Sequence, residues 1–331
     1  MKSERLNVLD GWRAISILAV LACHLLPIGP KAIQLNSAAG LFGMALFFTL
    51  SGFLVTQFLL YKPDVVNFLT RRFFRILPLA WLYIVFTLCL YSANIHTWLA
   101  HMFFYANYPP QPLIPMVTEH LWSLCVEMHF YIGIAILVAL FKKKGLLLIP
   151  LICIGITLLR VSQHMHDSII THFRIDEILA GAILALIYER KLGEMAFNFV
   201  RKQNFLLVLI LFVISCHPEG GALMYLRPYF AALLIGATLF NPETKLSQLL
   251  NHKALFYIAS ISYALYVIHP FLASTWLGSG EGWDKYFKRP LLFTVLFFLA
   301  HVSTYYYEQR CIAFGRNLSN SLSLRFNRAK K

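Results

Sequence analysis

Hydrophobic stretches of about 17 to 25 residues recur from one end of the chain to the other, and this is the length that a helix needs to cross a bilayer. Of the 331 residues 59% are hydrophobic and only 13% charged, so no part remains for a sizeable soluble domain. We predict an all-α, polytopic membrane bundle of about ten transmembrane helices. Its spans are expected roughly at residues 8–26, 38–61, 76–93, 120–141, 146–161, 169–188, 205–217, 223–240, 255–277 and 290–309.

The basic residues, which give a net charge of +14, are distributed unevenly between the predicted loops. If the N-terminus is cytoplasmic, most Lys and Arg fall in cytoplasmic segments, as the positive-inside rule requires. This favours an even number of spans in a bacterial inner membrane with both termini cytoplasmic, and it explains the charge without nucleic acid. We expect one transmembrane domain, residues 1–309, and a basic cytoplasmic tail, residues 310–331, lying along anionic lipid headgroups.

Three ionisable side chains interrupt the first predicted span: Asp10, Arg13 and His24. Each costs about 2.5 to 3.5 kcal/mol in a bilayer unless it has a partner, water or a function. Arg13 and His24 are eleven residues apart, so on a helix they lie within about 20° of one face and roughly 16 Å apart along the axis. Two interpretations stay open: a polar seam through the membrane, or an Asp10–Arg13 ion pair with a histidine bonded to backbone.

Two later spans place polar side chains at steps of three or four residues, so that each set shares one helix face. The sets are His120, Ser123, Glu127 and Tyr131, and Ser262, Tyr266 and His269. A buried Glu127 needs a partner across the bundle. For the second set, hydrogen bonding between helices is at least as good an interpretation as catalysis.

Two charged clusters stand at the ends of spans. They are Arg71, Arg72 and Arg75 before the third span, and Arg174, Asp176 and Glu177 at the start of the sixth. The arginines lie on the predicted cytoplasmic side, where guanidinium groups suit phosphate binding but also simply orient a helix. The mixed cluster lies on the outer side, as interfacial charges or as the rim of an acceptor site.

Metal and disulfide chemistry have little support in the sequence. The six cysteines lie singly, without a C-x-x-C pair. His164, His166 and Asp167 form a short polar loop with no fourth ligand in view, so we expect adventitious binding and no metal site.

Taken in order, these residues resemble the membrane-bound acyltransferase type 3 family over almost the whole chain. Arg13 and His24 resemble its R-x10-H motif, and Ser123 to Tyr131 resemble its most specific signature, S-L-x-x-E-x-x-F-Y. Further similar blocks are Phe47 to Leu54, Arg71 to Pro78, Phe173 to Gly181 and Ser262 to Pro270. One departure is that Glu308 lacks the proline that often follows the last family glutamate. Because the sequence ends after the last span, we expect the extracytoplasmic domain of some members to be absent.

The resemblance implies an O-acyltransferase, in the simplest case an O-acetyltransferase, that uses cytoplasmic acetyl-CoA or another acyl-CoA as co-substrate and holds no bound cofactor. The implied acceptor is a hydroxyl of a cell-surface, exported or lipid-linked glycan; the oligomeric state is left open. The expected catalytic residues are His24, Glu127 and Arg13, and the donor-binding residues are Arg71, Arg72, Arg75 and Asp10. Residues expected to bind the acceptor or support the site are His120, Ser123, Tyr131, Arg174, Asp176, Tyr266 and His269.

Two other classes of function use the same features. In a transporter or glycan flippase, the buried polar groups would bind substrate or relay protons. In a non-catalytic assembly factor, the fold would be retained without the chemistry. The simultaneous presence of Arg13, His24 and Glu127 favours the enzyme, and release of free CoA in the presence of an acceptor would separate it from the transporter.

Overall fold

The computed structural model describes residues 6–329, and within this range it is built from helices without a β-strand. This confirms the predicted all-α class. Lys2, Arg5, Lys330 and Lys331, on which the predicted cytoplasmic termini partly rest, lie outside the described residues. The chain forms two compact units, one comprising Met1–Gln57, Leu147–Ser168 and His172–Ser262, the other Phe58–Leu146, Ile169–Thr171 and Tyr263–Lys331.

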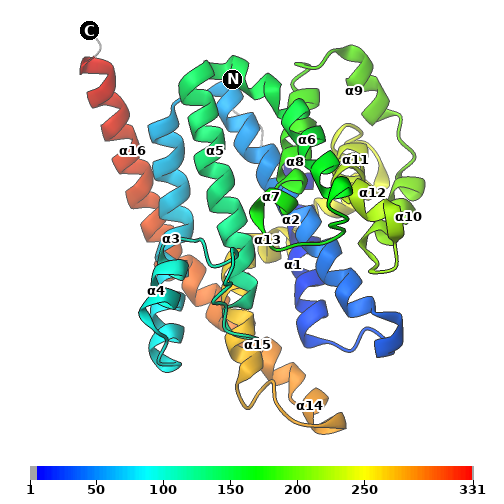
Figure 1. The fold of residues 1–331 in the computed structure, drawn as a ribbon, viewed down its shortest axis with the longest axis vertical. Coiled ribbons are helices and arrows are strands. Elements are labelled where there is room, and N and C mark those ends of the chain that lie inside the picture. Colours follow the sequence, from blue (N-terminus) through cyan, green and yellow to red (C-terminus); the bar gives the residue numbers. More distant parts are fainter. Residues whose placement is uncertain (1–5, 330–331) are drawn as a thin grey trace. The chain divides into compact units, whose positions relative to one another are not determined.

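The first unit contains the N-terminal helices and most of the middle of the chain. Its elements are α1 (Asn7–Leu25), most of α2 (Leu35–Tyr61), α6 (Ile149–Ser162), most of α7 (Thr171–Arg174), α8 (Asp176–Tyr188), α9 (Glu194–Arg201), α10 (Phe205–Cys216), α11 (Arg227–Leu239), α12 (Lys245–Leu250) and the start of α13 (Lys253–Ser274). Helix α8 packs against both α6 and α11 (Figure 1). A Cβ at Gly52 or Gly181 would overlap the backbone of the facing helix, so these glycines let α2 and α8 approach closely.

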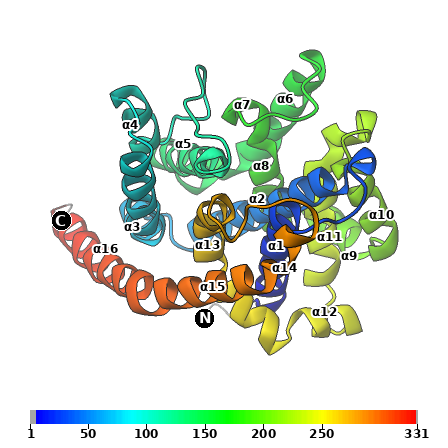
Figure 2. The ribbon, with the colours of Figure 1, turned by 90° about the horizontal axis from the view of Figure 1, so that it is seen from below.

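The second unit is organised around α3. Its elements are α3 (Val65–Leu90), α4 (Ile95–Met102), α5 (Trp122–Gly145), the rest of α13, α14 (Gly282–Phe287), α15 (Arg289–Val302), a π-helical turn (Ser303–Glu308) and α16 (Gln309–Ala329). Helix α3 packs against α4, α5 and α16. Figure 2 shows α15, the π-helical turn and α16 as one continuous curved run.

Short polar residues start several of these helices. Asp64, Asn94 and Asn204 each accept a hydrogen bond from the backbone N–H three residues on, at 2.9, 2.9 and 3.1 Å. Such caps satisfy a helix-terminal donor that an apolar segment would leave unpaired. The cap at Asp64 fixes the start of α3, and with it the positions of the three arginines that follow.

Seven helices among the described residues are long and apolar enough to cross a membrane, or eight if a pair bent by 87°, Gly193–Arg201 and Phe205–Cys216, forms one span. The ten spans expected from the sequence are therefore not all represented by separate long helices. One candidate, Glu119–Ser162, contains two predicted spans, which are separated at Lys142 by a backbone φ of 53°. The predicted span at 169–188 is divided into α7 and the 13-residue α8.

Candidate functional site

A pocket of about 310 Å³ lies in the second unit, and its lining contains four arginines. It is lined by Phe58, Phe68, Arg71, Arg72, Arg75, Ile312 and Arg316. The first three arginines are those predicted to bind a donor, and they follow the capped start of α3. The fourth comes from α16 and was not predicted. The structure thus brings the arginine cluster of the sequence to the wall of a cavity large enough for several phosphate groups.

Tyr131 joins this pocket to Glu127. The Arg72 guanidinium carbon lies 5.7 Å from the centroid of the Tyr131 ring. The centroid of the Phe68 ring lies 5.8 Å from the same Tyr131 centroid. The Tyr131 hydroxyl donates a hydrogen bond to the Glu127 carboxylate. Glu127 is 5% exposed, so its carboxylate is held in the interior. It lies one helical turn from Tyr131, which contacts two residues of the pocket lining.

Glu308 adds a second carboxylate on this side of the unit. It lies in the π-helical turn, and its Oε1 accepts hydrogen bonds from the Ser303 and Thr304 hydroxyls at 2.9 and 3.1 Å. The charge of Arg75 interacts with both Glu127 and Glu308. π-Helical turns occur often at functional sites because they redirect side chains out of the regular helical register. Glu308 is 6% exposed, so the turn holds a second acid in the interior of this unit.

The other end of the α5 polar face forms a compact cluster. Ser123 Oγ lies 2.6 Å from the Tyr266 hydroxyl, which donates a hydrogen bond to the His120 carbonyl at 2.5 Å. The His120 ring centroid lies 5.3 Å from that of Tyr266 and 5.7 Å from that of His269. Ser123 and Tyr131 are eight residues apart on α5, so polar groups extend roughly 12 Å along this helix from the pocket lining. His120 lies in the 3-10 turn Glu119–Leu121 just before α5.

The remaining predicted catalytic residues lie on α1 in the first unit. Asp10 and Arg13 are half-buried near its start, and the His24 side chain is exposed near its end. The Trp12 indole N–H donates to Thr238 Oγ1 at 2.8 Å, which anchors the helix beside Arg13.

Asn36 fixes the His24 end of α1. Its side-chain amide donates to the carbonyls of Cys23 and Leu26 at 2.8 and 2.7 Å, and to that of Ala22 at 3.3 Å. The Ala22 carbonyl also accepts from the Leu26 backbone N–H at 3.1 Å, whereas the last carbonyls of a helix have no partner within it. Asn36 was not predicted, because an asparagine eleven residues beyond the end of a helix gives no local signal of a cap.

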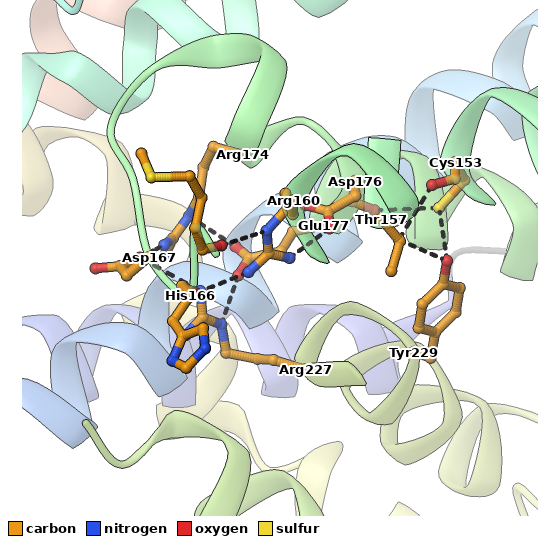
Figure 3. A network of polar contacts seen from close by, with 11 residues as sticks. Cys153, Thr157, Arg160, His166, Asp167, Arg174, Asp176, Glu177, Arg227 and Tyr229 are labelled. Carbon is orange, nitrogen blue, oxygen red and sulfur yellow. Dashed lines mark hydrogen bonds and ion pairs between the residues drawn. The ribbon is translucent and has the colours of Figure 1, made fainter. Parts of the chain in front are cut away.

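A buried ion-pair network organises the first unit (Figure 3). Arg160 Nη1 lies 2.5 Å from Asp176 Oδ2, and Arg227 Nε lies 2.7 Å from Glu177 Oε1. Arg174 pairs with Glu177 at 3.3 Å and also with Asp167. These pairs tie α6, α8 and α11 together.

Arg174 and Asp176 are therefore members of this network. Both are almost fully buried, whereas Asp167 is 46% exposed. The sequence analysis missed the role of Arg160 and Arg227, although an arginine in or beside an apolar span signals a partner through its insertion cost.

The loop of predicted adventitious metal ligands contributes to the same network. The His166 backbone carbonyl accepts a hydrogen bond from Arg160 at 2.7 Å. The centroid of the His166 ring lies 4.7 Å from that of the Tyr225 ring. In the part of the chain that the structure describes, no three His, Cys, Asp or Glu side chains are grouped so as to hold a metal ion.

Comparison with known proteins shows what the chain is similar to. Residues 6–308 match a family model described as an acyltransferase domain. A Staphylococcus aureus (strain COL) protein provisionally named an O-acetyltransferase is 28% identical, over 79% of this chain and 49% of its own length. The peptidoglycan O-acetyltransferase of Listeria monocytogenes serovar 1/2a (strain ATCC BAA-679 / EGD-e) is 26% identical, over 79% of this chain and 48% of its own. The chain thus spans about half the length of the curated relatives it matches. No solved structure matches it significantly.

Proposed function

The chain belongs to the membrane-bound acyltransferase type 3 family, and on this premise we propose that it transfers an acyl group, in the simplest case acetyl, from cytoplasmic acyl-CoA to a hydroxyl of a cell-surface or exported glycan. The acyltransferase class follows from the family. The donor, the acceptor, the inner membrane and the cytoplasmic termini are parts of the proposal. Its main support is the pocket of four arginines connected through Tyr131 to the buried Glu127.

In this proposal the arginine pocket binds the nucleotide of acyl-CoA. Guanidinium groups form charge-assisted, often bidentate hydrogen bonds with phosphate, and four of them line the cavity. The pantetheine arm would run from the pocket along polar groups such as those of α5. Asp10 and Arg13 would assist this binding from the first helix.

For the chemical step, His24 acts as general base. A neutral imidazole takes the proton of the acceptor hydroxyl as its oxygen attacks the thioester carbonyl carbon. Glu127 stabilises the imidazolium. Arg13, roughly 16 Å along the helix axis from His24, contacts the pantetheine arm in this scheme and not the reacting carbonyl. When the tetrahedral intermediate collapses, the carbon–sulfur bond breaks, and the thiolate takes the proton back from His24 to give free CoA. An acyl-enzyme on His24 is the close variant of this scheme.

The test uses the full chain in membranes with acetyl-CoA and a glycan acceptor. Release of free CoA and mass spectrometry of the glycan are both measured. We expect His24→Ala and Glu127→Gln to abolish transfer while the protein remains inserted and folded. The matched control is His96→Ala, because His96 is an exposed histidine on α4 outside the site. Normal transfer by His24→Ala would overturn the assigned mechanism.

The transporter alternative gives a different result in the same assay. A transporter or flippase moves substrate without producing CoA, so wild-type protein that releases no CoA in the presence of acceptor would favour that alternative. The buried polar face of α5 is the feature shared by both hypotheses.

A further inference from the structure

Helix α16 lies entirely beyond the part of the chain that matches the family model, which ends at residue 308. It nevertheless packs along α3, the helix that carries the predicted donor-binding arginines (Figure 1). Two of its residues, Ile312 and Arg316, line the arginine pocket. They are four residues apart, so they lie on one face of the helix.

Close packing between α3 and α16 brings this face to the pocket. A Cβ at Gly315 would overlap Phe74, so the glycine permits an approach that a larger residue would prevent. The Phe74 and Phe314 ring centroids lie 5.3 Å apart beside it. The residue before Arg316 is therefore fixed against the helix that presents the other three arginines.

Ser319 links the arginines of the two helices. Its side-chain oxygen accepts a hydrogen bond from Arg71 Nε at 3.2 Å and donates one to the Arg316 carbonyl at 2.9 Å. The Ser319 side chain is fully buried, and the half-buried Arg71 extends from it to the pocket. Asn320 Oδ1 accepts a further hydrogen bond from Arg71 Nη2 at 3.1 Å. Helix α16 thus both supplies one guanidinium and holds another.

We propose that α16 completes the donor pocket: Arg316 is a fourth ligand for the phosphates of acyl-CoA, and Ser319 and Asn320 position Arg71 for the same task. This inference rests on the proposed function. The charge of the ligand matches that of the pocket. The diphosphate and the separate phosphate of acyl-CoA together carry roughly four negative charges near pH 7, and four guanidinium groups line the pocket. The half-buried Phe58 ring, which packs 6.2 Å from the buried Phe68 ring, supplies aromatic surface against which a base can stack.

The experiment compares two donors, acetyl-CoA and S-acetylpantetheine, which has the same thioester without the nucleotide and its phosphates. We expect Arg316→Ala to raise the KM for acetyl-CoA about tenfold, as loss of a charge-assisted contact should, and to leave S-acetylpantetheine turnover unchanged. Arg316→Lys should restore part of the affinity, since the charge remains but the bidentate geometry does not. The matched control is Arg310→Ala, an exposed arginine of the same helix that does not line the pocket.

Ser319→Ala tests the positioning role. It should also raise the KM for acetyl-CoA without changing S-acetylpantetheine turnover. Thermal unfolding of each variant confirms that the fold is retained.

Failure of this inference is separable from failure of the proposed function. If wild-type protein uses neither donor and binds no CoA, the proposed function is wrong. If wild-type protein uses acetyl-CoA and the Arg316 variants behave like Arg310→Ala, only the role of α16 is overturned. A loss of activity that is equal for both donors would likewise contradict phosphate binding by Arg316.

Discussion

Arg227 and Glu177 form an ion pair with both side chains completely removed from solvent, Nε lying 2.7 Å from Oε1. The same carboxylate also faces Arg174 Nε at 3.3 Å, so Glu177 lies between two guanidinium groups. A charge in such a place is costly by itself and depends on its partners. The consequence is that neither side of the pair can be neutralised alone without leaving a charge uncompensated.

We therefore expect Glu177→Gln to lower the free energy of unfolding by about 3 to 5 kcal/mol, the usual cost of breaking a buried pair. The control is Glu194→Gln, which makes the same change in the exposed Arg190–Glu194 pair and should cost less than about 1 kcal/mol. Denaturant unfolding in detergent measures both. Similar small losses in the two variants would show that the network does not stabilise the fold.

This network illustrates how far one sequence can be interpreted. The insertion cost of a charge marks Arg174 and Asp176 as residues that need partners. It does not say which of the other charged residues they pair with, because Arg160 and Arg227 are brought to them by helix packing. The sequence left open interfacial charges or an acceptor rim, and the structure shows buried ion pairs whose role toward an acceptor stays a prediction.

The arginine pocket shows the same contrast. Arg71, Arg72 and Arg75 were identifiable because they stand close together just before a predicted span. Arg316 was not identifiable as a donor-binding residue. In a basic segment, a single arginine that binds a ligand cannot be told from one that only sets the orientation of the chain in the membrane. The number of spans was hard to predict for a different reason: the predicted span at 169–188 is divided between two short helices, α7 and α8.

Tyr131→Phe is expected to slow acyl transfer without weakening donor binding. Phenylalanine keeps the ring contacts with Phe68 and Arg72 but loses the hydroxyl that donates to Glu127. Loss of one hydrogen bond to a charged group, about 1.5 to 3 kcal/mol, corresponds to a roughly 10- to 160-fold lower kcat with an unchanged KM for acyl-CoA. Steady-state kinetics measure this, with the exposed Tyr105→Phe as control. A change in KM alone would instead place Tyr131 in donor binding.

Asn36→Ala is expected to loosen the end of α1 that carries His24. The substitution removes three hydrogen bonds to the carbonyls of the last turn. Amide hydrogen exchange should then become faster at Cys23 to Leu26, and kcat should fall at least several-fold. Asn198→Ala, an exposed asparagine on α9, is the control. Unchanged exchange in this turn would mean that Asn36 does not hold it.

We expect His101 to make the stability of the protein depend on pH. Its Nδ1 lies 2.8 Å from the Thr97 carbonyl and must donate to it, while Nε2, 2.9 Å from Thr118 Oγ1, accepts. The Thr118 oxygen already accepts from the Ile114 N–H, so its proton is available for the ring. This arrangement fits the neutral imidazole. Burial lowers the pKa of His101 from its ordinary value, and the Thr97 hydrogen bond offsets this only in part.

Because the folded protein binds this proton less readily than the unfolded chain, stability is greatest above the unfolded pKa of about 6.5 and falls as the pH is lowered through that value. The loss from one such group is at most about 1.4 kcal/mol per pH unit. Unfolding of wild type and His101→Gln in detergent between pH 8 and pH 5 tests this. We expect His101→Gln to be less stable at pH 8 but to lose less stability on acidification, whereas His96→Gln, an exposed neighbour on α4, should follow wild type. Parallel pH profiles for wild type and His101→Gln would contradict this assignment.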